Sequence, residues 1–188
     1  MDKKEDIRII KTKRNLYDSL LKLMKEKSFE EIKVSDICNL SLTNRSTFYD
    51  HFSDKFELLE SLLRDLEKEL IKKLAENEKI DNSKDYYMEM IKLFFDHIDE
   101  NSNIYCAILK KNNNSIALDM VNSTLLKDVE SFFSQKEVLH TDIPAEIISK
   151  FYVSGVISIC FDYIKYPKKY QKDKIVAYLD KLLPDKIY

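Results

Sequence analysis

Apolar residues near the start of the chain recur three and four positions apart, which is the spacing of one face of an α-helix. This pattern predicts a first helix over residues 4–27. Its apolar stripe consists of Leu16, Tyr17, Leu20, Leu21, Leu23 and Met24.

A short helix, a link and a second short helix are predicted next. Three apolar residues at three-residue spacing place the first of them over 34–40, and 41–43 is the link. Phe48 and Phe52 are four residues apart, so both face one core from the second helix. The Asn44 side chain is expected to cap the start of this helix, where backbone N–H groups lack partners.

The segments on either side attach this pair of helices to the rest of the chain. Phe29 and Ile32 are the apolar anchors of the preceding linker and are expected to pack beneath the pair. A long, leucine-rich helix is predicted over residues 55–77, with Ser53 as its cap.

From residue 84 onward the pattern is helical, without strand alternation or repeats. Polar residues 77–83 mark the boundary that precedes it. The predicted helical segments are 84–100, 103–111, 114–135, 144–166 and 170–183. The sequence therefore predicts an all-α fold, with an N-terminal three-helix head (1–53) and a C-terminal helical bundle (54–188).

Composition narrows the chemistry. The 188 residues include one glycine, so no glycine-rich phosphate loop can be formed. The three cysteines are far apart, which indicates a reducing compartment and neither a disulfide framework nor a zinc site. Without an apolar leader or a long apolar run, we expect a cytoplasmic protein that does not enter a membrane.

Two short helices joined by a tight turn form the helix-turn-helix plan, whose second helix enters the DNA major groove. Arg45, Ser46 and Thr47 are the candidates for contacts with base edges, because these side chains can hydrogen-bond to bases there. The other candidate DNA-binding residues are Ser35, Asn44, Tyr49, His51 and Lys55. For Tyr49, His51 and Lys55 the expected partner is phosphate, although Tyr49 has packing on the first helix as an alternative. Basic residues at the start of the first helix are either solvated or form a further phosphate-contacting arm.

The run from Asn44 to Tyr49, followed by His51, Phe52 and Lys55, resembles the recognition helix of the TetR family of bacterial repressors. The resemblance covers roughly residues 7–63. It also includes the following positions: Phe29, Ile32, Val34, Asp36, Ile37, Leu58 and Leu59. It implies a homodimeric regulator of double-stranded DNA, released when an effector tilts the long helix. Two positions depart from the pattern: Leu42 stands where glycine is usual and Lys33 where a hydroxyl residue is usual. They predict a less tight turn.

The helix predicted over 144–166 carries small residues together on one side. The candidate dimer-interface residues are Phe151, Ser154, Gly155, Ser158, Leu179 and Leu182, the last two from the final helix. Glycine inside a helix costs about 1 kcal/mol relative to alanine, so close helix approach across a two-fold axis is one explanation for Gly155. Close packing within one subunit is the other.

Aromatic residues are frequent in the C-terminal half. As a hypothesis, a cavity for a small apolar or aromatic effector is lined by Tyr87, Met90, Phe94, Tyr105 and Phe132. The alternative for each of them is plain core. His97, flanked by acidic residues, is expected at a solvated helix end and not in a metal site, and no cofactor is expected.

No catalytic group of residues can be assembled, so we do not expect an enzyme. The predicted function is a homodimeric, sequence-specific repressor of a palindromic operator, released by a small-molecule effector. The alternative is a protein-interaction module or coactivator of the same fold that has no effector.

Overall fold

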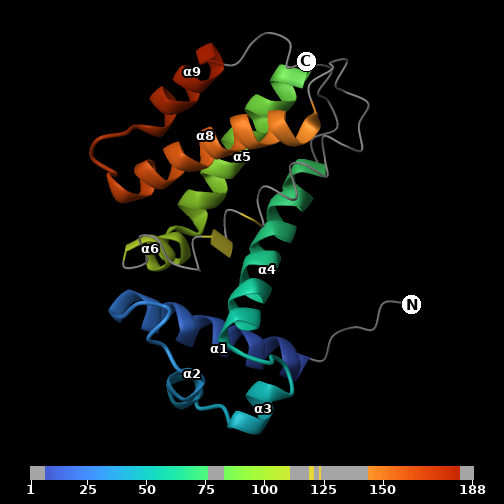
Figure 1. The fold of residues 1–188 in the computed structure, drawn as a ribbon, viewed down its shortest axis with the longest axis vertical. Helices are drawn as coiled ribbons and strands as arrows, with labels where there is room; N and C mark the ends of the chain where they lie inside the picture. The colour runs from blue at the N-terminus through green and yellow to red at the C-terminus, as the bar shows by residue number, and fades with distance from the viewer. Residues whose placement is uncertain (1–6, 76–82, 111–118, 121–122, 124–143, 183–188) are drawn as a thin grey trace. The chain divides into compact units, whose positions relative to one another are not determined.

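A computed structural model of the chain describes residues 7–75, 83–110, 119–120, 123 and 144–182 (Figure 1). Every regular element in these ranges is helical, which confirms the predicted all-α fold. The helices are α1 (Ile7–Glu26), α2 (Val34–Ser41), α3 (Arg45–Tyr49), α4 (Lys55–Ala75), α5 (Ser83–Glu100), α6 (Ser102–Lys110), α8 (Ala145–Lys165) and α9 (Lys172–Leu182). The helix predicted over 114–135 lies outside the described residues apart from three positions. No helix in the described ranges is apolar enough over its length to cross a membrane.

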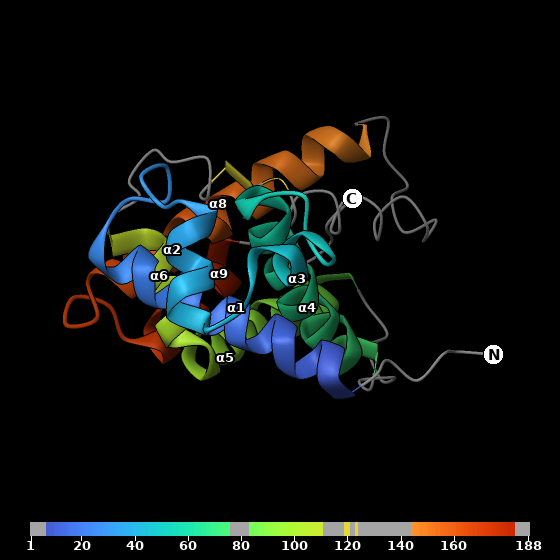
Figure 2. The same ribbon diagram turned by 90° about the horizontal axis from the view of Figure 1, so that it is seen from below.

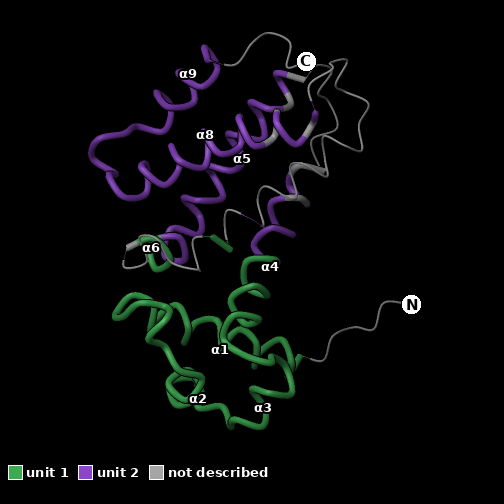
Figure 3. Tube along the Cα trace, in the orientation of Figure 1, with its two compact units in different colours: residues 1–65, 106–120 green, residues 66–105, 121–188 purple. Residues whose placement is uncertain are grey.

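The chain divides into two compact units (Figure 3). The first comprises residues 1–65 and 106–120, and the second comprises 66–105 and 121–188. The first unit therefore includes the first half of α4 as well as the three helices of the predicted head. We call residues 7–65 the head.

Packing in the head follows the predicted apolar pattern. Helix α2 lies against α1, as Figure 2 shows, and also contacts α3. Phe29, Ile32, Phe48 and Phe52 are all buried, which confirms their predicted place in the core. The Tyr17 hydroxyl of α1 donates to Asp65 of α4 at 3.0 Å and also shares a 2.8 Å hydrogen bond with Ser61. These bonds hold α1 along α4.

The second unit has its own apolar core, formed by residues of α5, α8 and α9 with parts of α4 and α6. Polar contacts at its surface join the same helices. Lys172 at the start of α9 pairs with Asp96 and with Asp99 of α5, the latter at 3.1 Å. The Tyr163 hydroxyl of α8 donates to Asp99 at 2.9 Å, so one carboxylate connects three helices.

His97 on α5 is buried, which corrects the expectation of a solvated helix end. Its ring lies edge-on to Tyr105, with ring centroids 5.9 Å apart, and its Nδ1 lies 3.3 Å from the amide nitrogen of Asn101. Burial lowers the pKa of His97 below its ordinary value, because the charged form loses its hydration. His97 is therefore a core residue in its neutral form. The described residues hold no cluster of three or more metal-ligating side chains.

The turn between α2 and α3 is tight, although it lacks glycine. Leu42 adopts the left-handed conformation (φ 54°, ψ 35°) and is the one non-glycine residue with positive φ among those described. Its N–H donates to Asn39 O at 3.4 Å, and the Thr43 N–H donates to Cys38 O at 3.0 Å. These two bonds form a Schellman motif, which ordinarily carries glycine at this position. The prediction of a less tight turn was wrong, because leucine accepts the strained conformation.

We expect the substitution Leu42→Gly to stabilise the protein by about 0.5–1 kcal/mol. Relief of roughly 1–2 kcal/mol of left-handed strain outweighs the flexibility that glycine adds to the unfolded chain. The Leu42 side chain is 94% exposed, so its removal costs no packing. The measurement is the urea midpoint at one protein concentration, with an unchanged slope.

The matched control is Leu40→Gly. Leu40 lies two residues earlier, inside α2, where glycine costs about 1 kcal/mol and should lower the midpoint. A lower midpoint for both variants would contradict the strain at Leu42.

Candidate nucleic-acid interface

Helix α3 is fixed from below by two aromatic residues and exposes its remaining side chains. Phe48 is fully buried and Phe52 almost so, with ring centroids 5.9 Å apart. Arg45 and Ser46 are exposed, Thr47 is half-buried, and Tyr49 is 56% exposed. The residues predicted to reach base edges therefore lie together on one short helix, away from the core.

Asn44 begins this helix with its backbone and not with its side chain. Its φ and ψ are extended, as at other helix N-caps, and its carbonyl accepts the Phe48 N–H at 3.0 Å. Its side chain makes no capping hydrogen bond, which corrects the expectation from the sequence. The Asn44 side chain is exposed and can approach DNA directly.

Tyr49 and His51 combine packing with exposure. The Tyr49 ring lies edge-on to Phe48, with centroids 5.4 Å apart, although most of its surface is open to solvent. The half-buried His51 ring lies 6.3 Å from that of Phe52. Tyr49 thus packs on Phe48 of its own helix, and this packing leaves the ring exposed enough for the proposed contact with DNA. Ser35, in the first turn of α2, is also half-buried.

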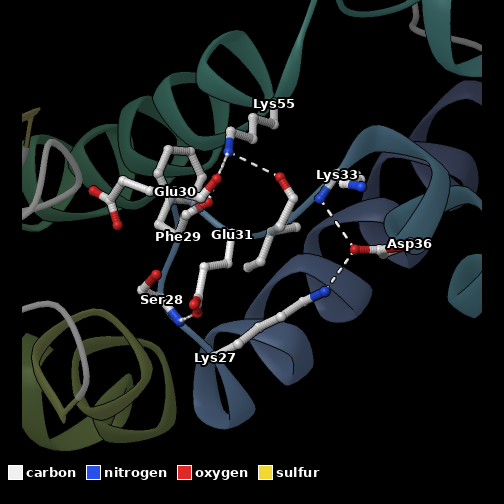
Figure 4. Close-up of polar contacts among 9 residues, drawn as sticks. Lys27, Ser28, Phe29, Glu30, Glu31, Lys33, Asp36 and Lys55 are labelled. Carbon is white, nitrogen blue, oxygen red and sulfur yellow. Dashed lines mark hydrogen bonds and ion pairs between the residues drawn. The ribbon is translucent and has the colours of Figure 1, made fainter.

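A carboxylate holds the start of α2. Asp36 accepts the Lys27 ammonium at 2.6 Å and the Lys33 backbone N–H at 3.1 Å (Figure 4). The hydrogen bond from Lys27 and then that from Lys33 hold the pKa of Asp36 below its ordinary value. A capping box normally has two hydrogen bonds. Here Asp36, the third helical residue, accepts the N–H of the N-cap residue Lys33, but the lysine side chain cannot accept the return bond that a hydroxyl residue would.

Lys55 differs from its predicted role. Its Nζ lies 2.8 Å from each of three backbone carbonyl oxygens, those of Phe29, Glu30 and Ile32. An ammonium group has three hydrogens, so in this geometry none is left for a DNA phosphate. The sequence indicated a cation near DNA but could not show these loop carbonyls, which lie more than twenty positions earlier.

The start of α4 has a different cap from the one predicted. Asp54 Oδ1 accepts the N–H groups of Phe56 at 2.8 Å and Glu57 at 2.9 Å. Ser53 instead donates both its N–H and its hydroxyl to Glu57 Oε2, each at 2.6 Å. Asp54 is therefore the capping residue, and Ser53 assists by holding Glu57.

The predicted basic arm is described from Ile7 onward. Arg8, Lys11 and Arg14 are exposed on α1 and Lys13 is half-buried, while the earlier lysines lie outside the described residues. These side chains add positive charge to the head.

The predicted effector residues lie in the core of the second unit. Tyr87, Phe94 and Tyr105 are buried there, and Met90 packs against them while partly exposed. Phe132 lies outside the described residues. Burial raises the pKa of both tyrosines above the ordinary value, so their hydroxyls stay protonated.

Most of the predicted dimer residues are exposed. Phe151 is 75% exposed and Leu182 is 74% exposed, and Ser154, Gly155 and Ser158 are also exposed. A Cβ atom added at Gly155 would meet no atom within 4 Å, so close packing within the described subunit does not explain this glycine. Leu179 is the exception: it is 6% exposed and packs into the core of its own unit, which corrects its assignment to an interface.

Two further exposed apolar residues lie on the same helices: Tyr178 belongs to the final helix expected at the dimer contact, whereas Ile147 was missed by the sequence reasoning. Ile147 lies four positions before Phe151 on α8, and Tyr178 lies four positions before Leu182 on α9. This spacing places each on the same face as its predicted neighbour, so the sequence held the signal. These exposed residues of both helices are called the apolar face, after their large apolar members. They are Ile147, Phe151, Ser154, Gly155 and Ser158 of α8, and Tyr178 and Leu182 of α9.

Comparison with known protein families gives two matches. The family described as "Bacterial regulatory proteins, tetR family" matches residues 16–62, and the one described as "Transcriptional regulator C-terminal region" matches residues 85–185. The second match alone covers more than half of the chain.

A similar relative is the uncharacterized HTH-type transcriptional regulator YxbF of Bacillus subtilis (strain 168), 36% identical over 64 residues. That match covers 34% of this chain and 17% of YxbF. Among solved structures, a TetR-family transcriptional regulator from Syntrophomonas wolfei str. Goettingen has a TM-score of 0.72 and 19% identity, covering 91% of this chain and 92% of that one. FadR from Bacillus subtilis, solved in complex with stearoyl-CoA, has a TM-score of 0.69 and 16% identity, covering 93% and 99%. These structures share the fold.

Proposed function

Because the chain belongs to the TetR family of bacterial transcriptional regulators, we propose that it is a homodimeric repressor of a palindromic operator, released by a small-molecule effector. Family membership makes it a DNA-binding regulator and not an enzyme. The observation that carries the finer proposal is the display of Arg45, Ser46 and Tyr49 on a helix whose opposite side is buried.

In this proposal α3 enters the major groove. Arg45 pairs with guanine through two hydrogen bonds, and Ser46 and Thr47 contact neighbouring bases. Ser35, Asn44, Tyr49 and His51 contact the sugar–phosphate backbone, and the basic residues of α1 add a contribution that does not depend on sequence.

The apolar face supports a homodimer. Phe151 and Leu182 are each about three-quarters exposed, and large apolar side chains gathered on a surface are typical of interaction sites. A two-fold axis would bring the same surface of two chains together, with the open space at Gly155 allowing close approach. Two recognition helices related by that axis would read inverted half-sites.

The effector is proposed to be small and apolar or aromatic. The supporting observation is the aromatic core around Tyr87, Phe94 and Tyr105, because such ligands bind among apolar side chains with few polar groups. FadR from Bacillus subtilis, which has a similar fold, was solved in complex with stearoyl-CoA, a ligand that carries a long apolar acyl chain. Release from DNA then requires that effector and operator prefer different dimer states.

The alternative, an interaction module with weakened DNA binding, drew on the departures at Leu42 and Lys33 and on the acidic second half of the chain. The two departures now support it less, since the turn closes at Leu42 and α2 is held at Asp36. We therefore retain the repressor, located in the cytoplasm, as the proposal.

Selection of bound sequences from random duplex DNA tests this proposal. The purified full chain at moderate salt should enrich a pair of inverted half-sites, because a symmetric dimer presents two identical helices. Absence of enrichment by a protein that remains dimeric would favour the interaction module.

Arg45→Ala should weaken binding to the selected operator by about 1–3 kcal/mol and relax the preference at one base position per half-site. The measurement is a set of binding isotherms on the operator and on its single-base variants. The matched control is Arg14→Ala, which removes the same charge from α1 and should weaken binding to all sequences alike. Equal loss on every sequence for Arg45→Ala would exclude a base-reading role.

Phe151→Asp should convert the dimer to a monomer, since it places a charge in the apolar face. Sedimentation velocity gives the oligomeric state, and affinity for the inverted repeat should fall to that for a single half-site. Ile7→Asp is the control: Ile7 is 69% exposed but lies on α1, outside the apolar face, and its substitution should leave the dimer intact. A Phe151→Asp protein that is still dimeric would remove this residue from the interface.

A further inference from the structure

The ammonium group of Lys55 is surrounded by contacts within the protein. Its Nζ is bonded to three carbonyl oxygens at 2.8 Å and also lies 4.9 Å from the Phe29 ring centroid and 5.4 Å from that of Phe56. The two rings lie edge-to-face with each other, 5.2 Å apart. Burial lowers the pKa of Lys55 below its ordinary value, yet the group keeps three charge-assisted hydrogen bonds that favour its charged form.

The position of this cation is unfavourable for α4 itself. Lys55 is the first residue of the helix, where the helix dipole and the unpaired N–H groups favour negative charge. The acidic residues Asp54 and Glu57 already satisfy that end. The lysine is therefore explained by what it binds, which is the loop of residues 28–33 between α1 and α2.

This loop meets three helices (Figure 4). The Lys27 ammonium and the Lys33 N–H bind Asp36 and so fix the loop to the start of α2. Lys55 fixes the same loop to the start of α4. We call this set of contacts the loop junction.

The loop junction attaches the helix-turn-helix to α4 directly. The described residues of the head show two other attachments: the chain itself, through the buried Phe52 that follows α3, and α1, on which α2 packs and which Tyr17 bonds to α4. Lys55 adds the attachment that fixes the loop between α1 and α2 to the start of α4. The three carbonyl groups come from residues 29, 30 and 32 and converge on one nitrogen at 2.8 Å each, which fixes the position of the loop relative to the start of α4.

We infer that Lys55 is a positioning residue for operator recognition: by holding the loop at 28–33 it sets the angle of α2 and α3 on α4, and it does not contact phosphate. This inference rests on the proposed function, because it concerns how the recognition helix is aimed. Its consequence is that Lys55 contributes to sequence-specific binding and not to general affinity for DNA.

Two variants separate positioning from phosphate contact. Lys55→Met removes the charge and leaves the carbonyls unpaired, while Lys55→Arg keeps the charge but has a planar group that cannot place three hydrogens from one nitrogen. We expect both variants to lose about tenfold or more in affinity for the selected operator, because a loop that is no longer fixed must be ordered, together with α2 and α3, when the protein binds DNA. Binding to a scrambled duplex should change little.

The salt dependence of DNA binding distinguishes positioning from a phosphate contact, because only a phosphate contact contributes to it. If Lys55 neutralised a phosphate, the slope of log K against log salt concentration would fall by about 0.9 for Lys55→Met and be retained by Lys55→Arg. We expect the wild-type slope in both variants. Lys11→Met serves as the comparison, because Lys11 is exposed on α1 and loses the same charge. A reduced slope for Lys55→Met with near-normal binding by Lys55→Arg would overturn the inference.

A measurement on the free protein keeps the test independent of any DNA target. NMR of the lysine side-chain ammonium groups at slightly acidic pH should show one group with slow hydrogen exchange, assigned to Lys55 by its absence in Lys55→Arg. In folded Lys55→Arg, backbone amide signals of α2 and α3 should shift, whereas in Lys11→Met they should not. A rapidly exchanging Lys55 ammonium, or unchanged α2 and α3 signals, would overturn the inference even if no operator were found. Failure of the DNA selection alone would count against the proposed repressor only.

Discussion

A helix of five residues cannot remain folded in water by itself, because its few hydrogen bonds do not offset the cost of ordering its backbone. The packing around α3 must therefore supply the stability that the helix lacks. The helix persists because Phe48 enters the core beneath it and Phe52 continues the same apolar contact toward α4. With the apolar positions committed to anchoring, the polar residues Arg45, Ser46 and Tyr49 are left on the outside. The side chains that stabilise α3 and those proposed to contact DNA thus lie on different faces of the same short helix.

Arg45 on this helix and Lys55 at the start of α4 are both basic, but their surroundings differ. Arg45 is exposed on α3 and keeps its guanidinium in solvent, where it can meet a base. Lys55 lies ten residues later, half-buried, with its ammonium enclosed by carbonyl oxygens and two aromatic rings. The first charge is available for an external partner and the second is used to complete the fold. A reading that counts basic residues near a helix-turn-helix would assign both to DNA, although the contacts of each are different in kind.

The predictable part of this structure is the part encoded by short-range periodicity. Spacings of three and four residues placed Phe29, Ile32, Phe48 and Phe52 in the core, and helix boundaries followed from the same pattern. Contacts between residues far apart in sequence, such as Lys55 with the loop at 28–33, leave no periodic signal. Local alternatives of similar chemistry are also difficult to separate: Ser53, Asp54 and Asn44 can all cap a helix, and Asp54 does so. In α9 both Leu179 and Leu182 are apolar, but the sequence does not show which stripe faces the core of its own subunit.

The proposed control by an effector would place a mechanical demand on the head. A shift in the population of dimer states can alter the separation of two recognition helices only if each helix moves with α4 and does not yield independently. The head meets this demand through contacts that converge on the first half of α4. Tyr17 bonds α1 to Ser61 and Asp65, Phe56 packs on Phe29, and Lys55 holds the loop carbonyls. Since α4 continues without interruption from Lys55 past the point where the second unit begins, a rotation of that helix would be passed to α3 as a rigid-body movement. Under the proposed function, a rigid loop junction would therefore be needed for release from DNA as well as for binding to it.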